Sequence, residues 1–386
     1  MFGWLLYNLE IVFFVLTRFM PFPVKTGVLK IGNPDRNSPV FITGNYRLTV
    51  IKVKKALKNI DCYLLVANSH GINVWCASAG GHFTNHSIIS VVKTSGIEEL
   101  VDHRKLVVPQ LLATGLLKKQ FEKATGWKVI WGPAYAVDIE KFVQVEFKKT
   151  SEMSLVHFSV IDRFEMASVW AFPISIIALL IAFYIKFSDD LLLVSLIWGI
   201  SLVLFLSFPL YEGFLRKETP LLSFKYYDLR LGIIQIVYWV LSIIGITTFI
   251  SLEYNTVPQS AIINWSIFSL VLVIAITFDM LGNTPTYKSS MSEERLLSIT
   301  LDNEKCKGAA FCEVVCPKGC FEVDHINHKA KIVDATLCVK CGSCVTQCPF
   351  DALYYKTPDN KIVEPDTIRR YKLNMMGKRM KKISIE

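Results

Sequence analysis

The sequence predicts a multidomain membrane protein with a small α/β domain, four transmembrane helices and a cysteine-rich α+β domain. Three observations predict this. Short apolar runs alternate with helix-like segments before residue 150, four long apolar runs follow, and eight of the ten cysteines lie between Cys306 and Cys348. The hydrophobic share of 52% favours a membrane protein over a soluble enzyme, and 386 residues leave room for two or three domains.

Residues 1–38 are expected to form an N-terminal interfacial or core segment. Its start, Met1 to Met20, is apolar but carries Glu10 and Arg18. It has no basic beginning and no small-residue cleavage site, so a cleavable secretory signal is not predicted. The pattern does not decide whether this helix lies at the membrane interface or spans the membrane.

Residues 39–165 are expected to form an α/β domain with a mostly parallel, Rossmann-like sheet. Four short, branched runs bounded by turn residues predict buried strands, at 39–43, 62–67, 105–109 and 128–132. The segments between them have helical spacing, at 47–59, 85–96 and 111–126. Ligands of such sheets bind beyond the carboxyl ends of the strands, and the stretch HGINVWCASAGGHFTNHS (70–87) directly follows the second strand.

Residues 166–283 are expected to form the transmembrane four-helix domain. Four runs are long enough to cross a bilayer and carry no charge in their interiors: 168–186, 191–211, 231–252 and 261–281. One set of flanking loops is acidic, with Asp189, Asp190 and Glu253. The other set is basic, with Lys148, Lys149, Arg163, Arg216, Lys217, Lys225 and Arg230. The positive-inside rule therefore places both large domains on the cytoplasmic side of a multi-pass protein in the cytoplasmic membrane.

Residues 284–363 contain the cysteines at iron–sulfur spacing. The second half reads Cys338-x2-Cys341-x2-Cys344-x3-Cys348-Pro349, which matches the bacterial two-cluster ferredoxin. In the first half, Ala309 stands where the pattern has a second thiolate.

The fourth cysteine of each run ligates the other cluster in this arrangement, which fixes two ligand sets. One complete [4Fe–4S] cluster is expected on Cys316, Cys338, Cys341 and Cys344. The second cluster keeps three thiolates, Cys306, Cys312 and Cys348, which suit a [3Fe–4S] cluster or a [4Fe–4S] cluster with an open iron. Cys320 should lie near the complete cluster, either as a spare thiol or as a small buried apolar residue.

Cysteine usage and charge also bound the setting of the protein. Cluster-type spacing indicates a reducing cytosolic environment rather than a disulfide framework. We interpret the net charge of +9 as basic loops that set the orientation of the protein in the membrane, and we expect no nucleic-acid partner. The basic tail, residues 364–386, includes RRYKLNMMGKRMKK and predicts either contact with membrane lipid or a solvated charged helix.

Cys76 stands apart from the other metal-type cysteines. Free cysteines are often buried core residues, and we interpret Cys62 in that way. Cys76 instead follows a strand end, among polar and glycine residues, in a chain that carries electron-transfer cysteines. Zinc is not favoured, because the nearby histidines lack zinc-site spacing; they are His70, His82, His86 and His103.

Three segments resemble the corrinoid-binding protein of microbial mercury methylation, which is related to the corrinoid iron–sulfur protein of acetyl-CoA synthesis. They are GINVWCASAGG (71–81), VDHRKLVVPQL (101–111) and GWKVIWGP (126–133). The family motif is N-[VI]-W-C-A-[AS]-G-K on a helix that caps the corrinoid. That protein continues into membrane helices and has a two-cluster ferredoxin partner, so this chain resembles a fusion of the two.

The resemblance implies a corrinoid (cobalamin-type) cofactor and a set of site residues. Cys76 would be the lower axial cobalt ligand and the catalytic residue. The corrinoid cap would be Asn73, Val74, Trp75, Cys76, Ala77 and Ser78. An axial thiolate donates electron density to cobalt and favours departure of a methyl group as a carbanion or radical.

Two departures from the family pattern bear on the substrate. Ala79 and Gly80 replace the usual Gly-Lys, and no cysteine follows Cys348, whereas the ferredoxin partner carries further cysteines near its end. Together with Ala309, they support the corrinoid and the redox pairing better than they support mercury.

The leading expectation is a membrane-anchored, corrinoid-dependent methyltransferase with a built-in ferredoxin, whose candidate reaction is methylation of Hg(II) to methylmercury. The expected partners are membrane lipid, a soluble methyl donor such as a methylated-pterin methyltransferase, a low-potential electron donor and Hg(II). Two alternatives remain: a corrinoid methyl carrier of one-carbon metabolism with another acceptor, and a membrane electron-transfer protein without corrinoid.

Overall fold

Two compact units make up the chain in the computed structural model, which describes residues 2–184, 190–216, 228–253, 259–277, 293–373 and 379–381. The helical unit comprises residues 1–20 and 157–295. The mixed unit comprises residues 21–156, here named the sheet module, and residues 296–386, here named the cysteine module. The helical unit is therefore inserted in sequence between the two modules of the mixed unit.

The sheet module is built on five strands in the order β1-β3-β2-β4-β5. Four of them are parallel: β2 (Val40–Gly44), β3 (Cys62–Ala67), β4 (Lys105–Val108) and β5 (Lys128–Trp131). The four predicted strands and the mostly parallel sheet are therefore confirmed. The fifth strand, β1 (Gly27–Ile31), pairs antiparallel with β3 at the edge. The predicted domain boundary at residue 39 is therefore wrong, because the sheet already begins within residues 1–38, the predicted N-terminal segment.

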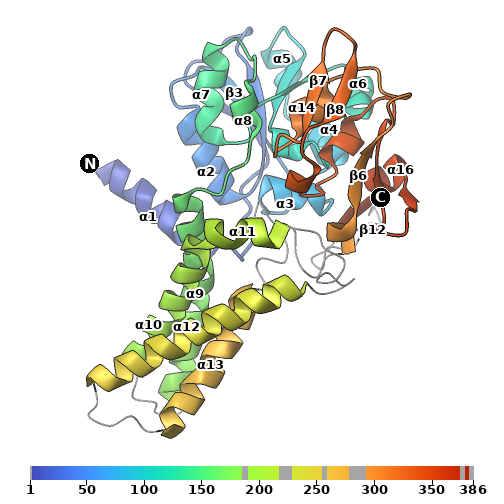
Figure 1. Cartoon of the computed structure of the whole chain (residues 1–386). Coiled ribbons are helices and arrows are strands. Elements are labelled where there is room, and N and C mark those ends of the chain that lie inside the picture. Colours follow the sequence, from blue (N-terminus) through green and yellow to red (C-terminus); the bar gives the residue numbers. More distant parts are fainter. Residues whose placement is uncertain are drawn as a thin grey trace. The chain divides into compact units, whose positions relative to one another are not determined.

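Helices cover both faces of this sheet (Figure 1). One face carries α4 (Asn85–Thr94) and α6 (Lys118–Thr125), whose Ile88 and Phe121 are fully buried in one core cluster. The other face carries α2 (Arg47–Ala56) and α7 (Ile139–Gln144), with Phe142 in a second cluster. Shorter helices complete the module, namely α3 (Val74–Ala79), α5 (Ile97–Leu100), η1 (Gln110–Leu112), η2 (Ala136–Asp138) and α8 (Ser151–Ser154).

One predicted helix is wrong. Residues 111–126 form η1, an irregular loop and α6 rather than a single helix. The loop is tightly packed at Gly115, where an added Cβ would lie 2.2 Å from the carbonyl oxygen of Phe83. Side chains from the cysteine module also donate hydrogen bonds to carbonyl groups of this loop. Tertiary contacts therefore override the helical spacing of the sequence.

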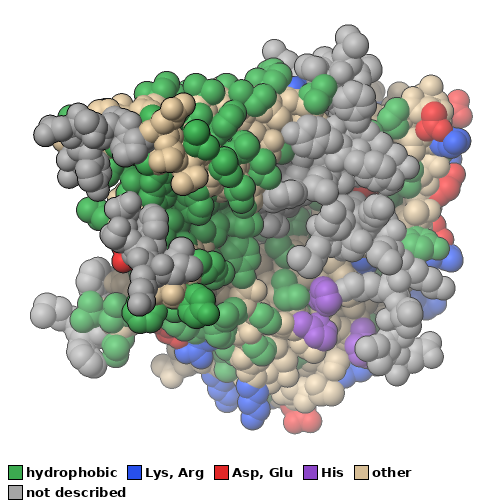
Figure 2. Space-filling model, turned by 90° about the horizontal axis from the view of Figure 1, so that it is seen from below, with side chains coloured by type: hydrophobic (Ala, Val, Ile, Leu, Met, Phe, Trp, Pro, Cys, Tyr) green, Lys and Arg blue, Asp and Glu red, His purple; other side chains and the backbone are tan. Residues whose placement is uncertain are grey.

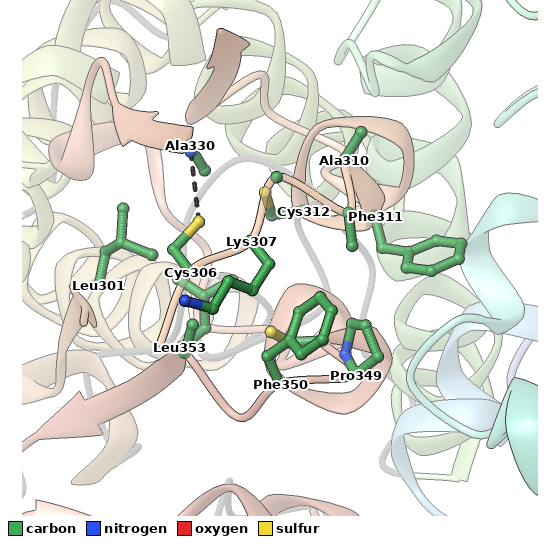
Figure 3. A pocket seen from close by; sticks show the side chains of 14 residues that line it. Leu301, Cys306, Lys307, Ala310, Phe311, Cys312, Ala330, Pro349, Phe350 and Leu353 are labelled. Atoms are coloured by element: carbon green, nitrogen blue, oxygen red, sulfur yellow. Dashed lines mark hydrogen bonds between the residues drawn. The ribbon is translucent and has the colours of Figure 1, made fainter. Parts of the chain in front are cut away.

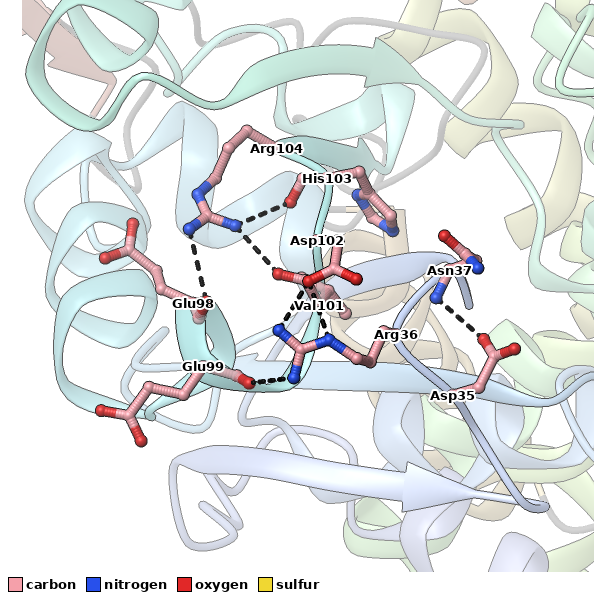
Figure 4. A network of polar contacts seen from close by, with 9 residues as sticks. All are labelled: Asp35, Arg36, Asn37, Glu98, Glu99, Val101, Asp102, His103 and Arg104. Carbon is pink, nitrogen blue, oxygen red and sulfur yellow. Dashed lines mark hydrogen bonds and ion pairs between the residues drawn. The ribbon is translucent and has the colours of Figure 1, made fainter.

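An exposed polar network joins two loops at the strand ends (Figure 4). The Arg36 guanidinium donates to Asp102 (2.8 Å) and to the carbonyl of Glu99 (3.4 Å). The hydrogen bond from Arg36 lowers the pKa of Asp102. Both side chains face solvent, so the pair fixes loop positions more than it contributes to stability.

The cysteine module is an α+β fold of short elements. Its sheet has the order β10-β9-β6, from β6 (Ser298–Leu301), β9 (Leu353–Lys356) and β10 (Ile362–Val363). A hairpin of β7 (Phe321–Asp324) and β8 (Lys329–Ile332) adjoins it. The two short helices inside the cysteine runs, α14 (Phe311–Val315) and α15 (Ser343–Gln347), pack against each other. The segments η4 (Glu293–Leu296) and η5 (Ala335–Leu337) complete the chain up to the predicted tail.

The predicted tail, residues 364–386, is not wholly separate from this module. It contains α16 (Pro365–Arg370), β11 (Tyr371–Leu373) and β12 (Arg379–Lys381). Ile368 is fully buried in the module core, and Arg369 donates to the carbonyl of Cys348 (3.1 Å). Residues 374–378 and 382–386 of the predicted tail lie outside the described residues.

The helical unit contains α1 (Phe2–Leu16), α9 (Val160–Tyr184), α10 (Asp190–Leu206), α11 (Phe208–Arg216), α12 (Leu229–Glu253) and α13 (Gln259–Thr277). Among the described residues, three helices are long and apolar enough to cross a membrane: Val160–Tyr184, Leu229–Leu252 and Gln259–Thr277. Their outward side chains are mostly hydrophobic (green, Figure 2). Asp189, Lys217 and Lys225, used in the topology prediction, lie outside the described residues.

The predicted span 191–211 is interrupted, because α10 and α11 form a pair bent by 59°. The break falls at Ser207, two residues before Pro209, and proline lacks the N–H that would continue the helix ladder. Ser207 Oγ also contacts the Tyr238 hydroxyl on α12. A fourth membrane span would require that α10 and α11 together cross the membrane as one bent segment.

The two modules of the mixed unit share a core. Val315 of α14 belongs to the main apolar cluster of the sheet module. Lys149, which the sequence suggested was a loop charge, is instead partly buried between the modules. Its Nζ donates to Gln110 Oε1 (2.5 Å) and to the carbonyl of Val314 (2.6 Å). Burial lowers the pKa of Lys149 from 10.5 to about 7.

This lysine makes stability depend on pH. Its folded-state pKa is below its unfolded value, so the unfolded chain binds more protons between pH 7 and 10.5, and stability should rise with pH there by at most about 1.4 kcal/mol per unit. Unfolding of the full chain in detergent, followed from pH 7 to 10, should give a smaller slope for Lys149→Met than for the wild type. The exposed neighbour provides the control, Lys148→Met, and equal slopes in all three proteins would contradict the assignment.

Candidate functional site

Helix α3 (Val74–Ala79) presents Cys76 on its outer side. Val74, Ala77 and Ser78 are buried, at the i, i+3 and i+4 positions of one helical face. Cys76 lies on the opposite face and is exposed, in contrast to Cys62, which is fully buried in β3. Ordinary core packing, the usual role of a free cysteine, therefore accounts for Cys62 and not for Cys76.

Asn73 starts this helix. Its Oδ1 accepts a hydrogen bond from the backbone N–H of Trp75 (3.0 Å), as an N-cap residue does. The structure thus gives Asn73, predicted as a corrinoid-cap residue, a definite local role.

Asn45 holds the loop before α3, and the sequence analysis missed it. It follows β2, is buried, and its Oδ1 accepts from the backbone N–H groups of Ser69 (2.9 Å) and Gly71 (3.0 Å). Gly71 has φ +67° and an added Cβ would lie 2.8 Å from the nitrogen of Pro23, which only glycine tolerates. The sequence did hold a signal for this role. Asn45 follows the carboxyl end of a strand, as the stretch with Cys76 does, and ligand sites of such sheets lie at these strand ends.

Aromatic and histidine side chains surround Cys76 in the sequence, and Cys76 is exposed. Trp75 is half-buried beside it, and the exposed rings of His70 and His82 meet edge to face at 5.4 Å. His86 is exposed on α4, while His103 lies elsewhere, with its Nε2 2.9 Å from the Ser38 carbonyl. Within the described part of the chain, no group of three or more His, Cys, Asp or Glu side chains could hold a metal ion by itself. An exposed thiol on a helix anchored from behind is chemically suited to ligate the metal of a cofactor brought from outside the domain.

One cavity of the cysteine module brings together the complete predicted ligand set. Cys316, Cys338, Cys341 and Cys344 all line it. Burial raises the pKa of the Cys341 thiol to about 11, so binding of iron there must displace protons from the thiols.

Cys320 lines the same cavity and is almost fully buried. Its backbone N–H donates to Cys316 Sγ (3.3 Å). A further hydrogen bond between the Cys320 and Cys316 side chains lowers the pKa of Cys316. Cys320 therefore acts as a neighbour that favours the Cys316 thiolate, and it is the fifth cysteine around this cavity.

A second cavity gathers the incomplete set (Figure 3). It is lined by Cys306, Cys312 and Cys348, with Ala309 in the wall where the ferredoxin pattern has a thiolate. The backbone N–H of Ala330 donates to Cys306 Sγ (3.3 Å). Burial raises the pKa of Cys312 to about 12. Both cavities have thiols around a hollow, which fits clusters better than single ions.

The sequence of the sheet module is similar to that of known corrinoid proteins. A sequence model of the CO dehydrogenase/acetyl-CoA synthase delta subunit family matches residues 15–143. The acetyl-CoA decarbonylase/synthase complex subunit gamma of Methanopyrus kandleri is 39% identical over 128 residues, 33% of this chain and 27% of that protein. The corrinoid/iron-sulfur protein large subunit of Moorella thermoacetica is 33% identical over 127 residues, 32% of this chain and 28% of that protein.

The chain spans about a quarter of the length of these relatives. A sequence model of the 4Fe-4S binding domain matches residues 331–354, which contain Cys338, Cys341, Cys344 and Cys348. The chain thus combines a domain of the corrinoid/iron–sulfur protein type with a 4Fe–4S ferredoxin-type domain.

The cap role of Asn73 can be separated from contact with a cofactor. Asn73→Ala should lower the free energy of unfolding of the mixed unit by about 1 kcal/mol, because the Trp75 N–H loses its acceptor. Asn73→Asp keeps an acceptor oxygen and should retain most of the stability. Denaturant unfolding of the cofactor-free full chain measures both variants, and an unchanged Asn73→Ala protein would remove the cap assignment.

Proposed function

We propose that this chain is a corrinoid-dependent methyltransferase that carries its own iron–sulfur clusters. The observation that carries the proposal is Cys76, an exposed thiol on an anchored helix of a domain similar to corrinoid/iron–sulfur proteins. A second observation supports it: the cysteine module packs into the same compact unit.

A corrinoid, when bound, supplies a cobalt centre that takes a methyl group from one partner and gives it to another, and that needs electrons to stay reactive. In this proposal Cys76 would hold that centre through its thiolate, and Trp75 would pack against the cofactor. Asn73, Val74, Ala77 and Ser78 hold the helix in place. The complete [4Fe–4S] site and the three-thiol site deliver the electrons.

Hg(II) is the acceptor that the resemblance to the mercury-methylation family favours, because a soft cation accepts a methyl group that leaves with its electron pair. Ala79 and Gly80, and the absence of cysteine after Cys348, depart from that family. A second candidate, a methyl carrier of one-carbon metabolism, is favoured by the similarity to subunits of acetyl-CoA decarbonylase/synthase complexes. A third, a membrane electron-transfer protein without corrinoid, rests on the cysteine cavities alone.

The proposed setting is the cytoplasmic face of the cytoplasmic membrane. The apolar helices α9, α12 and α13 support insertion into lipid. The methyl donor would be a soluble methylated-pterin methyltransferase, and a low-potential donor would feed the clusters.

Corrinoid binding tests the proposal directly. Anaerobic reconstitution of the full chain with a corrinoid should give a base-off, thiolate-ligated spectrum that Cys76→Ala abolishes. His86→Ala, a change at a nearby exposed residue, should keep the spectrum. A wild-type spectrum identical to that of Cys76→Ala would favour the electron-transfer alternative.

The acceptor is tested with a methyl donor, reductant and Hg(II). Methylmercury should form with wild type and fall at least about tenfold with Cys76→Ala. Electron consumption near two per methyl transferred is expected, because uptake of the methyl group as a cation and its release as a carbanion would leave the centre oxidised by two electrons in each turnover. A value well below one, with another acceptor methylated, would favour the carrier.

Iron content tests the two cluster sites. The reconstituted wild type should hold about seven to eight iron atoms per chain, as expected for one complete and one three- or four-iron cluster. Cys341→Ser should remove about half of this iron, whereas Cys62→Ala, at a buried core thiol, should leave the content unchanged. About four iron atoms in the wild type would contradict the second cluster.

A further inference from the structure

The loop between η1 and α6, residues 113–117, lies between α3 and the cysteine module. Three of its carbonyl groups accept hydrogen bonds from cysteine-module side chains. Gln347 Nε2 donates to the carbonyls of Ala113 (2.7 Å) and Leu116 (2.5 Å). Lys372 Nζ donates to the carbonyl of Thr114 (2.9 Å). All of these contacts are buried, so the cysteine module fixes the backbone of the loop.

The opposite side of the same loop supports α3. Ser78 Oγ donates to the carbonyl of Leu111 (3.2 Å), just before the loop. At Gly115 an added Cβ would lie 3.1 Å from Ser78 Cα, so the loop is in direct contact with the helix that carries Cys76. A displacement of either neighbour must therefore move the loop.

Thr114 adds a hydroxyl that points to the complete cysteine site. Its Oγ1 lies 2.9 Å from Ser343 Oγ and 3.3 Å from the carbonyl oxygen of Cys341, and the Thr114 and Ser343 side chains are buried. Ser343 Oγ in turn lies 3.5 Å from Cys341 Sγ, one of the four predicted cluster ligands.

The direction of these hydrogen bonds follows from the chemistry of a bound cluster. A thiolate that ligates iron has no proton, so Cys341 Sγ can only accept and Ser343 must donate to it. With the Ser343 proton directed at the sulfur, the 2.9 Å contact requires the Thr114 hydroxyl to donate to the Ser343 oxygen, in preference to the Cys341 carbonyl at 3.3 Å. A donor that itself accepts a hydrogen bond is strengthened by it, so Thr114 reinforces the bond to the sulfur.

We propose that Thr114 is a positioning residue through which the sheet module tunes the reduction potential of the cluster held by Cys316, Cys338, Cys341 and Cys344. Hydrogen bonds to cluster sulfurs stabilise the reduced, more negative state and raise the potential. The proposal rests on the cluster assignment made under the proposed function. It extends that function, because the potential of the electron donor then depends on how the loop beneath α3 is held.

The test is a redox titration of the reconstituted full chain, without corrinoid, followed by electron paramagnetic resonance. Thr114→Val, which keeps the shape but loses the hydroxyl, should shift the cluster to lower potential, with about a fivefold fall in the equilibrium constant for one-electron reduction. Ser343→Ala should shift it at least as far, and Thr114→Ser should restore the wild-type value. Thr94→Val, at an exposed threonine of α4, is the matched control and should change nothing.

A wild-type potential for Thr114→Val, while Ser343→Ala is shifted, would overturn the role of Thr114. If the valine variant does not fold, Thr114→Ala carries the same expectation. Failure of the wild type to bind corrinoid would refute the methyl-transfer function and leave this measurement intact, because the clusters are assembled without corrinoid. Absence of any reducible cluster would overturn both proposals.

Discussion

The mixed unit depends on how the carbonyl groups of residues 113–117 are satisfied. Where the predicted helix 111–126 breaks, the backbone loses its helical hydrogen bonds, and buried carbonyls without partners are costly. Gln347 and Lys372 supply the missing donors from the cysteine module. The same loop contacts α3. The position of the helix that carries Cys76 and the packing of the cysteine module against the sheet module therefore both depend on this loop.

The parts of the fold that could be predicted are those that local periodicity encodes. The four buried parallel strands are short apolar runs with clear ends, and the structure places them within a residue of expectation. The edge strand β1 escaped prediction because its half-exposed GVLKI pattern resembles a loop. The helix break at 113–117 depends on distant partners, which spacing along the chain cannot reveal, whereas the bend at Ser207 has a local signal in Pro209.

The candidate site likewise has features that the local sequence predicts and features that only the fold brings together. Ligand spacing around a cluster is a local, covalent constraint, so the grouping of cysteines into a four-thiol and a three-thiol cavity could be worked out before the structure. The roles of Asn45 and Lys149 depend on carbonyls and N–H groups that only the fold brings close. Lys149 also shows that a charge counted for topology can instead be a buried donor between modules.

The insertion of the helical unit between the two modules has a consequence for biosynthesis. Residues 157–295 emerge from the ribosome after the sheet module and before the cysteine module. During that interval the carbonyls of Ala113, Thr114 and Leu116 have none of the cysteine-module donors that cover them in the finished protein. The loop under α3 therefore reaches its final form only after the apolar helices and the cysteine module have been translated.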